Sequence, residues 1–344
     1  MRAAIFDTVG RPLRIGDVPE PRPGADEVVL RVSACGICGS DLHITEDPAP
    51  FGIGAGFVLG HEFAGEIVET GTDVGDLAVG DRVAVVPMRG CGRCAACRRG
   101  DPGRCPEMTL IGGGYAEHVA VAARQCVRLP DGVDTADGAL AEPLAVALHC
   151  IVRSGMKPGD RVAILGAGPI GLLVAFWARR MGAAAVVVAD LHDHQCDRAL
   201  ALGATAFAIS DGRLAERLAD ACGGAPDIVF ECVGKRGLIA AAVGAVRLQG
   251  TVVGVGLCIG GDEWDPFVAL SKEVNLLFSV FFHQGNEFAV ALDALAATPF
   301  RPQALVTDTI GLGQVPQVFE GLRRRTTQCK VLIRPDLDRG DATT

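Results

Sequence analysis

A cysteine, two histidines and a glutamate lie close together in the first part of the sequence. Cys38 and His43 belong to the segment GICGSDLH at 36–43, and His61 and Glu62 follow a stretch rich in proline and glycine. A thiolate, an imidazole and a carboxylate are the ligand mixture that a catalytic zinc prefers. Ser40 and His43 offer a hydroxyl and a second imidazole, which could pass a proton away from a zinc-bound oxygen. Alternatively, this is a loop with one buried cysteine and unrelated polar residues.

Four further cysteines form the strongest signal in the sequence. Cys91, Cys94, Cys97 and Cys105 lie in a segment that contains almost no apolar side chains. Such a segment cannot be stabilised by burial, whereas four thiolates on one tetrahedral zinc would hold it together. Because protein ligands would fill all four positions, we interpret this zinc as structural. Four free thiols are one alternative. A zinc ribbon that binds nucleic acid is the other, because arginines alternate with the cysteines.

Glu142 is a third candidate ligand. It stands in the apolar run 139–149, immediately before Pro143, which would start or kink a helix. An unpaired carboxylate is costly to bury, and a zinc at Cys38 and His61 would remove that cost. On the sequence alone, Glu142 is either a zinc ligand or an ordinary carboxylate at a helix start.

A dinucleotide-binding pattern begins at residue 161. Residues 161–165 predict a buried strand, 166–171 (GAGPIG) a glycine-rich turn, and 172–181 an apolar helix, and a second strand at 184–189 leads to an acid. This order is the pattern in which glycines let the pyrophosphate approach and the acid binds the ribose hydroxyls. The acid would repel a 2′-phosphate, so NAD is favoured over NADP. The candidate residues are Gly166, Gly168, Pro169, Ile170, Gly171 and Asp190.

Two later strands are predicted to end at the same edge of this sheet. Residues 227–234 and 250–256 are apolar runs that lead into loops containing glycine. The cofactor rests at the carboxyl edge of such a sheet, so these loops add Cys232, Val233, Val255 and Gly256 to the candidate cofactor residues. Residues 275–282 and 330–333 predict further strands, and 287–297 and 315–324 predict helices.

Composition narrows the class of protein. The chain has 344 residues, enough for two domains with separate cores. Its net charge of −9, without a basic run, argues against a nucleic-acid partner. No apolar stretch is long enough to predict a membrane span. The 13 cysteines are odd in number and several lie in apolar runs, which indicates a reducing compartment and metal binding. We therefore expect a cytoplasmic protein.

The distribution of motifs predicts two domains of the α/β class. Early apolar runs such as 28–32 alternate with proline and glycine turns, as short β-strands do. We predict a β-rich catalytic domain at 1–153 and 301–344. Residues 154–300 are predicted to form a doubly wound, parallel-sheet domain that binds the cofactor.

Over nearly its full length the sequence resembles the zinc-containing medium-chain alcohol dehydrogenases, and within them the branch of sorbitol, threonine and butanediol dehydrogenases. The resemblance rests on residues 36–43, 60–62, the four-cysteine segment, 141–144 and 166–171. It implies a GroES-like catalytic domain and a Rossmann cofactor domain. It also implies that Cys38 and His61 bind the catalytic zinc, that Glu62 and Glu142 supply carboxylate directly or through water, and that Ser40 and His43 relay the proton.

The resemblance implies an NAD-linked enzyme that reversibly oxidises a secondary alcohol to a ketone. It further implies two zincs per chain, one catalytic and one structural, and a homodimer or homotetramer. Relatives that oxidise polyols carry an aromatic residue and an arginine where Ile44 and 280–282 stand here. We therefore expect an alcohol with an apolar body, with a polyol, 2,3-butanediol or threonine as the alternative. A non-catalytic, zinc-stabilised NAD-binding protein is the alternative from another class.

Overall fold

The computed structural model describes residues 1–296, 301–324 and 326–342 and divides the chain into two compact units. Unit 1 comprises Met1–Glu142, His283–Ala297 and Val306–Thr344, and unit 2 comprises Pro143–Phe282 and Thr298–Leu305. This division places 143–153 with unit 2 and 283–297 with unit 1, whereas the sequence predicted boundaries at 153 and 300. The second predicted boundary falls in 297–300, outside the described residues, and the domain limits stay predictions.

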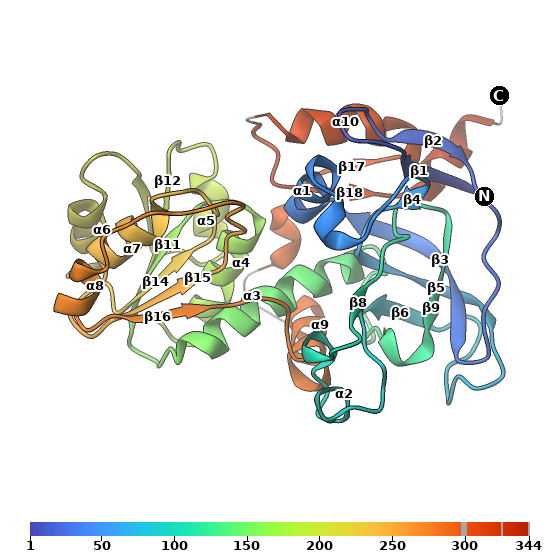
Figure 1. Ribbon diagram of the computed structural model, residues 1–344, viewed down its shortest axis with the longest axis horizontal. Helices are drawn as coiled ribbons and strands as arrows, with labels where there is room; N and C mark the ends of the chain where they lie inside the picture. The colour runs from blue at the N-terminus through green and yellow to red at the C-terminus, as the bar shows by residue number, and fades with distance from the viewer. Residues whose placement is uncertain (297–300, 325, 343–344) are drawn as a thin grey trace. The chain divides into compact units, whose positions relative to one another are not determined.

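Unit 1 is built around a seven-stranded, mostly antiparallel sheet. Its order is β10-β6-β5-β3-β18-β17, and β9 also pairs with β3. The strands are β3 (Glu27–Gly36), β5 (Glu62–Thr70), β6 (Arg82–Val85), β9 (His118–Ala122), β10 (Cys126–Arg128), β17 (Val306–Ile310) and β18 (Lys330–Ile333). In Figure 1 the red C-terminal strands β17 and β18 lie next to blue N-terminal segments of this unit, and β18 pairs with β3. The sheet buries an apolar core that includes Leu30, Phe63 and Ile67.

Three strands of this sheet meet at Gly36. The residue pairs with Glu62 of β5 on one side and with Leu332 of β18 on the other. A Cβ atom at position 36 would lie 2.0 Å from Glu62 Oε2. The absence of a side chain at Gly36 therefore leaves room for the Glu62 carboxylate above the central strand.

A short helix that the sequence analysis did not predict follows β3 directly. This helix, α1 (Gly39–Glu46), buries Asp41, Ile44 and Thr45, and Cys38 is its N-cap residue. The Asp41 side chain accepts a hydrogen bond of 3.2 Å from the Cys38 amide, which fixes the first turn. The helix places Cys38, Ser40 and Asp41 within one turn of each other.

The other elements of unit 1 are small. A three-stranded sheet contains β2 (Arg14–Asp17), β1 (Arg2–Phe6) and β4 (Phe57–Val58), and β7 (Met88–Arg89) pairs with β8 (Thr109–Leu110). The helices are α2 (Ala95–Arg98), α9 (Ala289–Ala296) and α10 (Val315–Leu322). A π-helical turn, η5 (Gln284–Phe288), precedes α9, so the helix predicted at 287–297 begins later than expected. Its predicted last residue lies outside the described residues.

Unit 2 is the predicted doubly wound domain. Its six-stranded sheet is parallel throughout and has the order β13-β12-β11-β14-β15-β16. The strands are β11 (Arg161–Leu165), β12 (Ala185–Asp190), β13 (Ala206–Ile209), β14 (Ile228–Glu231), β15 (Thr251–Gly254) and β16 (Asn275–Phe278). Numbered within the unit, the order is 3-2-1-4-5-6, which reverses between β11 and β14. Ligands of such sheets bind at the carboxyl edge beside that reversal.

In the part of unit 2 that the structure describes, one helix, α3, precedes the first parallel strand and five others connect the strands; all six are labelled in Figure 1. They are α3 (Ala141–Ser154), α4 (Pro169–Arg180), α5 (Cys196–Ala201), α6 (Leu214–Cys222), α7 (Leu238–Ala245) and α8 (Phe267–Ser271). Strand β16 ends four residues before the predicted limit of 282. Phe281 has a φ of 62°, which extended strand geometry does not allow. Among the helices of the described residues, none is long and apolar enough to cross a membrane.

Candidate active site and metal centres

Three of the predicted ligands meet in unit 1. Single ligand atoms of Cys38, His61 and Glu62 all lie within 4.8 Å of one another. Cys38 follows the end of β3, and His61 and Glu62 lie at the start of the neighbouring β5, so the pairing of these strands brings the three residues close together. His61 is 6% exposed and Glu62 is 1% exposed. The arrangement offers sulfur, nitrogen and oxygen to one small space, as a zinc site requires.

The two predicted relay residues lie on α1. The hydroxyl of Ser40 is 3.1 Å from Cys38 Sγ and 3.5 Å from His61 Nε2, so it borders the ligand cluster. His43 lies one turn further along the helix, with Nδ1 at 3.6 Å from Glu46 and 40% of its side chain exposed. The serine therefore faces the cluster, and the histidine faces solvent.

Asp41 was not predicted as a site residue, yet it orients His61. Its Oδ1 lies 3.2 Å from His61 Nδ1, which leaves Nε2 as the nitrogen beside Ser40 and the cluster. Burial opposes ionisation of Asp41, but the His61 imidazole and hydrogen bonds outweigh it and hold the pKa of the carboxyl below its usual range. An acid three residues after an N-cap residue was the sequence signal that could have identified it.

Glu62 forms a buried ion pair with Lys330 of β18. The Lys330 ammonium lies 2.8 Å from Oε1 and 2.6 Å from Oε2, and it also donates to the Ile37 carbonyl at 3.2 Å. Burial lowers the pKa of Lys330, but the facing Glu62 carboxylate has the larger combined effect and the pKa is raised. Sequence reasoning assigned no role to Lys330. A lysine that opens the otherwise apolar strand KVLI was the available signal.

Glu142 is buried close to the cluster, but it is not one of the three residues whose ligand atoms meet there. Burial raises the pKa of Glu142 to about 7, the positive charge of His61 opposes that rise, and Glu62 adds to it. Its side chain is not among the atoms that lie within 4.8 Å of each other. Within the described residues, no hydrogen bond or ion pair holds its carboxylate. Glu142 is therefore a buried acid without a hydrogen-bond partner among the described residues, and the charges of the cluster affect its pKa.

The four cysteines of the second group meet as predicted. Single Sγ atoms of Cys91, Cys94, Cys97 and Cys105 all lie within 4.8 Å of one another. Backbone amides point at these sulfurs: Cys97 donates to Cys94 Sγ at 3.5 Å, and Cys91 donates to Cys105 Sγ at 3.3 Å. The Cys97 amide lowers the pKa of Cys94 to about 7, whereas burial raises the pKa of Cys97 to about 11. Four sulfurs fill a tetrahedral site and leave no open position, which is the donor set of a structural zinc.

The glycine-rich turn of unit 2 has the geometry expected of a phosphate-binding loop. Gly166 has a φ of 104°, Gly168 is the N-cap residue of α4, and Pro169 occupies its first turn. A Cβ at Gly171 would lie 2.0 Å from the Gly166 carbonyl oxygen, so only glycine permits this turn. The first amides of a helix have no partner within it, so the start of α4 offers donors for anion binding.

Asp190 stands at the end of β12, where the ribose acid is expected. Its Oδ2 accepts a hydrogen bond of 2.7 Å from the Ala167 amide, and its Oδ1 accepts one of 2.7 Å from Leu191. A hydrogen bond therefore links the Asp190 carboxylate directly to the glycine-rich loop. His192, two residues later, has a buried Nε2 atom for which no partner was found in the described residues.

The loops after β14 and β15 pack together at the same edge of the sheet. Glu231, 2% exposed, accepts hydrogen bonds from the amides of Val233 at 2.7 Å and Gly234 at 2.8 Å. A Cβ at Gly256 would lie 2.0 Å from the Gly234 nitrogen, so this contact requires a glycine. Cys232 and Val255 belong to these two loops. Glu231, which shapes the first loop, was missed because it reads as one polar residue in an apolar run.

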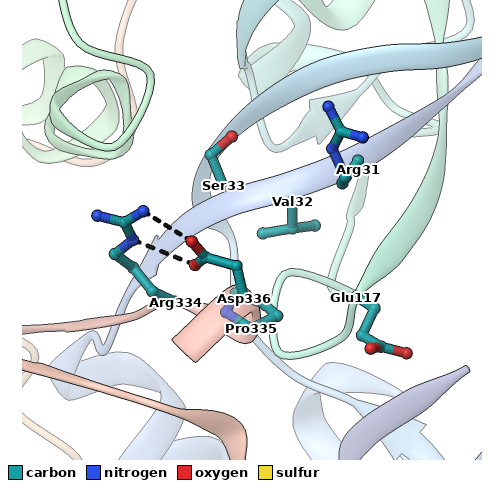
Figure 2. A pocket seen from close by; sticks show the side chains of 7 residues that line it. All are labelled: Arg31, Val32, Ser33, Glu117, Arg334, Pro335 and Asp336. Carbon is teal, nitrogen blue, oxygen red and sulfur yellow. Dashed lines mark hydrogen bonds and ion pairs between the residues drawn. The ribbon is translucent and has the colours of Figure 1, made fainter. Parts of the chain in front are cut away.

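A separate cavity of about 110 Å³ lies elsewhere in unit 1. It is lined by Arg31, Val32, Ser33, Glu117, Arg334, Pro335 and Asp336 (Figure 2). Arg31 pairs with Glu66 at 2.8 Å, and Arg334 pairs with Asp336 at 2.8 Å. None of the predicted ligands lines it, and its cations are already neutralised, so the cavity is not part of the metal centre.

Two known families match the chain, one in each part. Residues 24–131 match the family described as alcohol dehydrogenase GroES-like domain, and residues 169–297 match the family described as zinc-binding dehydrogenase. These matches agree with the GroES-like and Rossmann domains that the resemblance implied.

Full-length relatives extend these matches. Sorbitol dehydrogenase of Gallus gallus is 36% identical and the alignment covers 94% of each chain. The structure of 2R,3R-butanediol dehydrogenase from Bacillus subtilis has 31% identity and a TM-score of 0.86, over 97% of this chain and 99% of that one. A structure from Sinorhizobium meliloti 1021, bound to NADP, has 34% identity and a TM-score of 0.86 over the same shares. The chain belongs to the zinc-dependent medium-chain alcohol dehydrogenases, in the branch of the sorbitol dehydrogenases, and is an oxidoreductase.

Proposed function

We propose that this enzyme oxidises a secondary alcohol to the ketone, reversibly, with a catalytic zinc bound at Cys38, His61 and a carboxylate and with NAD as hydride acceptor. The observation that carries the proposal is the meeting of a thiol, an imidazole and a carboxylate within 4.8 Å in a chain that also has a complete dinucleotide-binding loop. The four-cysteine site has no ligand position left for a substrate, whereas the three-donor cluster leaves one position free. A purely structural role would not need that free position.

The buried carboxylates divide into one that is already paired and one that is free. Both oxygens of Glu62 contact the Lys330 ammonium, whereas the Glu142 carboxylate has no partner among the described residues. We propose that Glu142 binds the zinc directly or through water. Glu62 reaches the metal only when it loosens its contact with Lys330, and otherwise contributes its charge from nearby.

Bound zinc acts as a Lewis acid that makes an alcohol more acidic, and bound nicotinamide accepts the hydride. The protein supplies the path of the proton. Ser40 Oγ lies beside Cys38 Sγ and His61 Nε2, where it accepts the proton of an alcohol held at the cluster. His43, exposed on the same helix, passes the proton to solvent. Asp41 holds the His61 ring so that Nε2 remains the ligand atom.

The first prediction concerns the two metal centres. Wild-type protein should contain two zincs per chain. Cys94→Ser should lower the melting temperature strongly, because binding to four thiolates contributes roughly 10–16 kcal/mol in small zinc modules. Cys38→Ser should keep the melting temperature near that of the wild type and abolish turnover. Metal analysis, thermal unfolding and an NAD-linked assay measure the three quantities.

Cys258→Ser is the matched control, because Cys258 is a half-buried thiol outside both clusters. It should retain both zincs and full activity. A wild-type zinc content below one per chain would contradict the assignment of both centres.

The second prediction concerns cofactor choice. The Asp190 carboxylate stands where it would bind the ribose and repel a 2′-phosphate, although the Sinorhizobium relative was solved with NADP. Asp190→Ala should lower the ratio of kcat/KM for NAD to that for NADP by about tenfold, equivalent to about 1.4 kcal/mol. Asp193→Ala removes a nearby exposed acid and should leave the ratio unchanged. Wild-type efficiency that is equal or higher with NADP would show that our interpretation of Asp190 is wrong.

The segment 49–57, which follows α1, is the feature that favours an apolar substrate. Two of the residues that suggested an apolar pocket are core residues instead: Ile44 is 2% exposed and Phe282 is 1% exposed. Residues 49–57 (APFGIGAGF) still contain no side chain that can form a hydrogen bond, and Phe51 is 43% exposed. A polyol beside this segment would lose hydrogen bonds at about 1–3 kcal/mol each. We therefore propose a secondary alcohol with an apolar body, and a polyol is the second candidate because the relatives include sorbitol dehydrogenase.

The third prediction compares these candidates directly. The kcat/KM for a medium-chain or cyclic secondary alcohol should exceed the values for 2,3-butanediol, sorbitol and threonine. Phe51→Ser should lower kcat/KM for the apolar alcohol by about tenfold, because one apolar group in a pocket contributes on that scale. Val79→Ser, at an apolar residue that is 63% exposed, is the control and should have no effect. If sorbitol or threonine ranked first, the substrate proposal would fail while the metal and cofactor proposals remained.

We also propose that the enzyme is a homo-oligomer that associates through unit 2. Strand β16 lies at one end of the parallel sheet, and no strand of the described residues pairs with its outer edge. Exposed apolar side chains occur on or near it, including Phe278 at 64%, Leu270 at 73% and Phe267 at 66%. A free, apolar strand edge is a template for pairing with a second strand, and a second copy of β16 would satisfy it by an antiparallel, two-fold arrangement.

The fourth prediction tests this contact. Light scattering should give a mass that is a multiple of the chain mass for the wild type. Phe278→Lys should lower that mass, because a charge would be buried against its own copy, whereas the control Val79→Lys should not. A monomeric wild type would refute the proposal.

The cytoplasmic location of the protein also stays a prediction, and fractionation of cells that express the protein would test it.

A further inference from the structure

Tyr115 is a buried residue to which neither the metal centres nor the proton path assigns a role. It is the only tyrosine in the chain and is 0% exposed. Its hydroxyl donates a hydrogen bond of 2.6 Å to Asp41 Oδ2. Its ring meets the Phe319 ring edge-on, with centroids 6.4 Å apart. The residue therefore joins the loop before β9 to α1 from inside the core.

The Tyr115 hydroxyl supports the carboxylate that orients His61. Asp41 Oδ1 lies 3.2 Å from His61 Nδ1, while Oδ2 accepts hydrogen bonds from Tyr115 and, at 3.2 Å, from the Cys38 amide. The shortest of these contacts is the one from Tyr115. Burial raises the pKa of Tyr115 well above its usual value, and Asp41 raises it further, so the hydroxyl keeps its proton and remains a donor.

The tyrosine ring also restrains the backbone before His61. Gly60 has a φ of 90°, and a Cβ at that position would lie 2.4 Å from the Tyr115 ring. Glycine at 60 thus permits the ring to lie directly against the peptide that leads into His61. The Tyr115 side chain therefore adjoins two neighbours of His61: its hydroxyl binds Asp41, and its ring lies against Gly60.

We propose that Tyr115 is a positioning residue for the catalytic metal: its hydroxyl fixes Asp41, and Asp41 fixes the His61 ring with Nε2 toward the ion. The inference rests on the proposed function to the extent that His61 must be a zinc ligand. Packing alone does not require the hydroxyl, because phenylalanine would fill the same space without bringing a polar group into the core. Groups that orient a ligating histidine through its second nitrogen contribute to metal affinity although they never touch the metal.

The test is the rate at which a chelator removes zinc from Tyr115→Phe and from the wild type. A chromogenic chelator should release zinc in two phases. The phase that is missing in Cys38→Ser belongs to the catalytic centre. In Tyr115→Phe this phase should be about tenfold faster, the low end of the range for groups that orient ligands. The phase that belongs to the four-cysteine centre should be unchanged.

Two further variants separate positioning from general stability. Phe319→Leu loosens the packing around the Tyr115 ring but keeps the hydroxyl, so it should lower the melting temperature and leave zinc release unaltered. Asp41→Asn should itself speed release. Adding Tyr115→Phe to Asp41→Asn should then have little further effect, because the hydroxyl acts through the carboxylate.

Release from Tyr115→Phe at the wild-type rate would overturn the inference, and so would an equal acceleration by Phe319→Leu. A full tenfold effect of Tyr115→Phe in the Asp41→Asn background would show that the hydroxyl does not act through Asp41. By contrast, a wild type without a zinc phase that depends on Cys38 would refute the proposed metal centre itself. The two failures are therefore distinguishable.

Discussion

The buried ion pair between Glu62 and Lys330 is the contact on which the geometry of the metal centre depends. Glu62 begins β5, Lys330 begins β18, and both strands flank Gly36 of β3, whose missing side chain leaves space for the Glu62 carboxylate. Removing one partner of such a pair typically costs about 3–5 kcal/mol, because the other charge stays buried without compensation. The pair therefore links β5 to β18 across β3, at the end of the sheet where Cys38 and His61 lie.

The charges around this pair explain why the site suits a divalent cation. Three acids, Asp41, Glu62 and Glu142, are each at most 8% exposed. Among the described residues, the basic groups that act on them are His61 and Lys330. A thiolate at Cys38 would add to the negative charge. Buried charge of one sign is costly unless it is paired or bound to metal. Burial raises the pKa of Glu142 to about 7, and the negative charge of Glu62 adds to that rise, which a bound cation would oppose.

The sequence was sufficient where function depends on residue type and spacing, and insufficient where it depends on contacts between distant segments. The four-cysteine group, the glycine-rich turn before α4 and the parallel sheet of unit 2 were all predicted from local pattern, whereas the order of the strands was not. Asp41, Tyr115 and Lys330 could not be assigned, because each acts through a partner far away along the chain or hidden in an unpredicted helix. Ile44 and Phe282 show the opposite error: apolar residues near a motif were taken for a pocket, and they belong to cores.

The separation of Glu62 from Lys330 by 268 residues has a consequence for synthesis. Most of unit 2 is one continuous stretch, Pro143–Phe282, whereas unit 1 is assembled from three pieces that enclose it in the sequence. A ribosome delivers the whole of that stretch before it delivers β18, and domains tend to fold as they emerge. The parallel sheet can thus form while the catalytic half still lacks a strand. The Glu62–Lys330 contact, which lies beside the proposed metal centre, can form only after β18 has been synthesised.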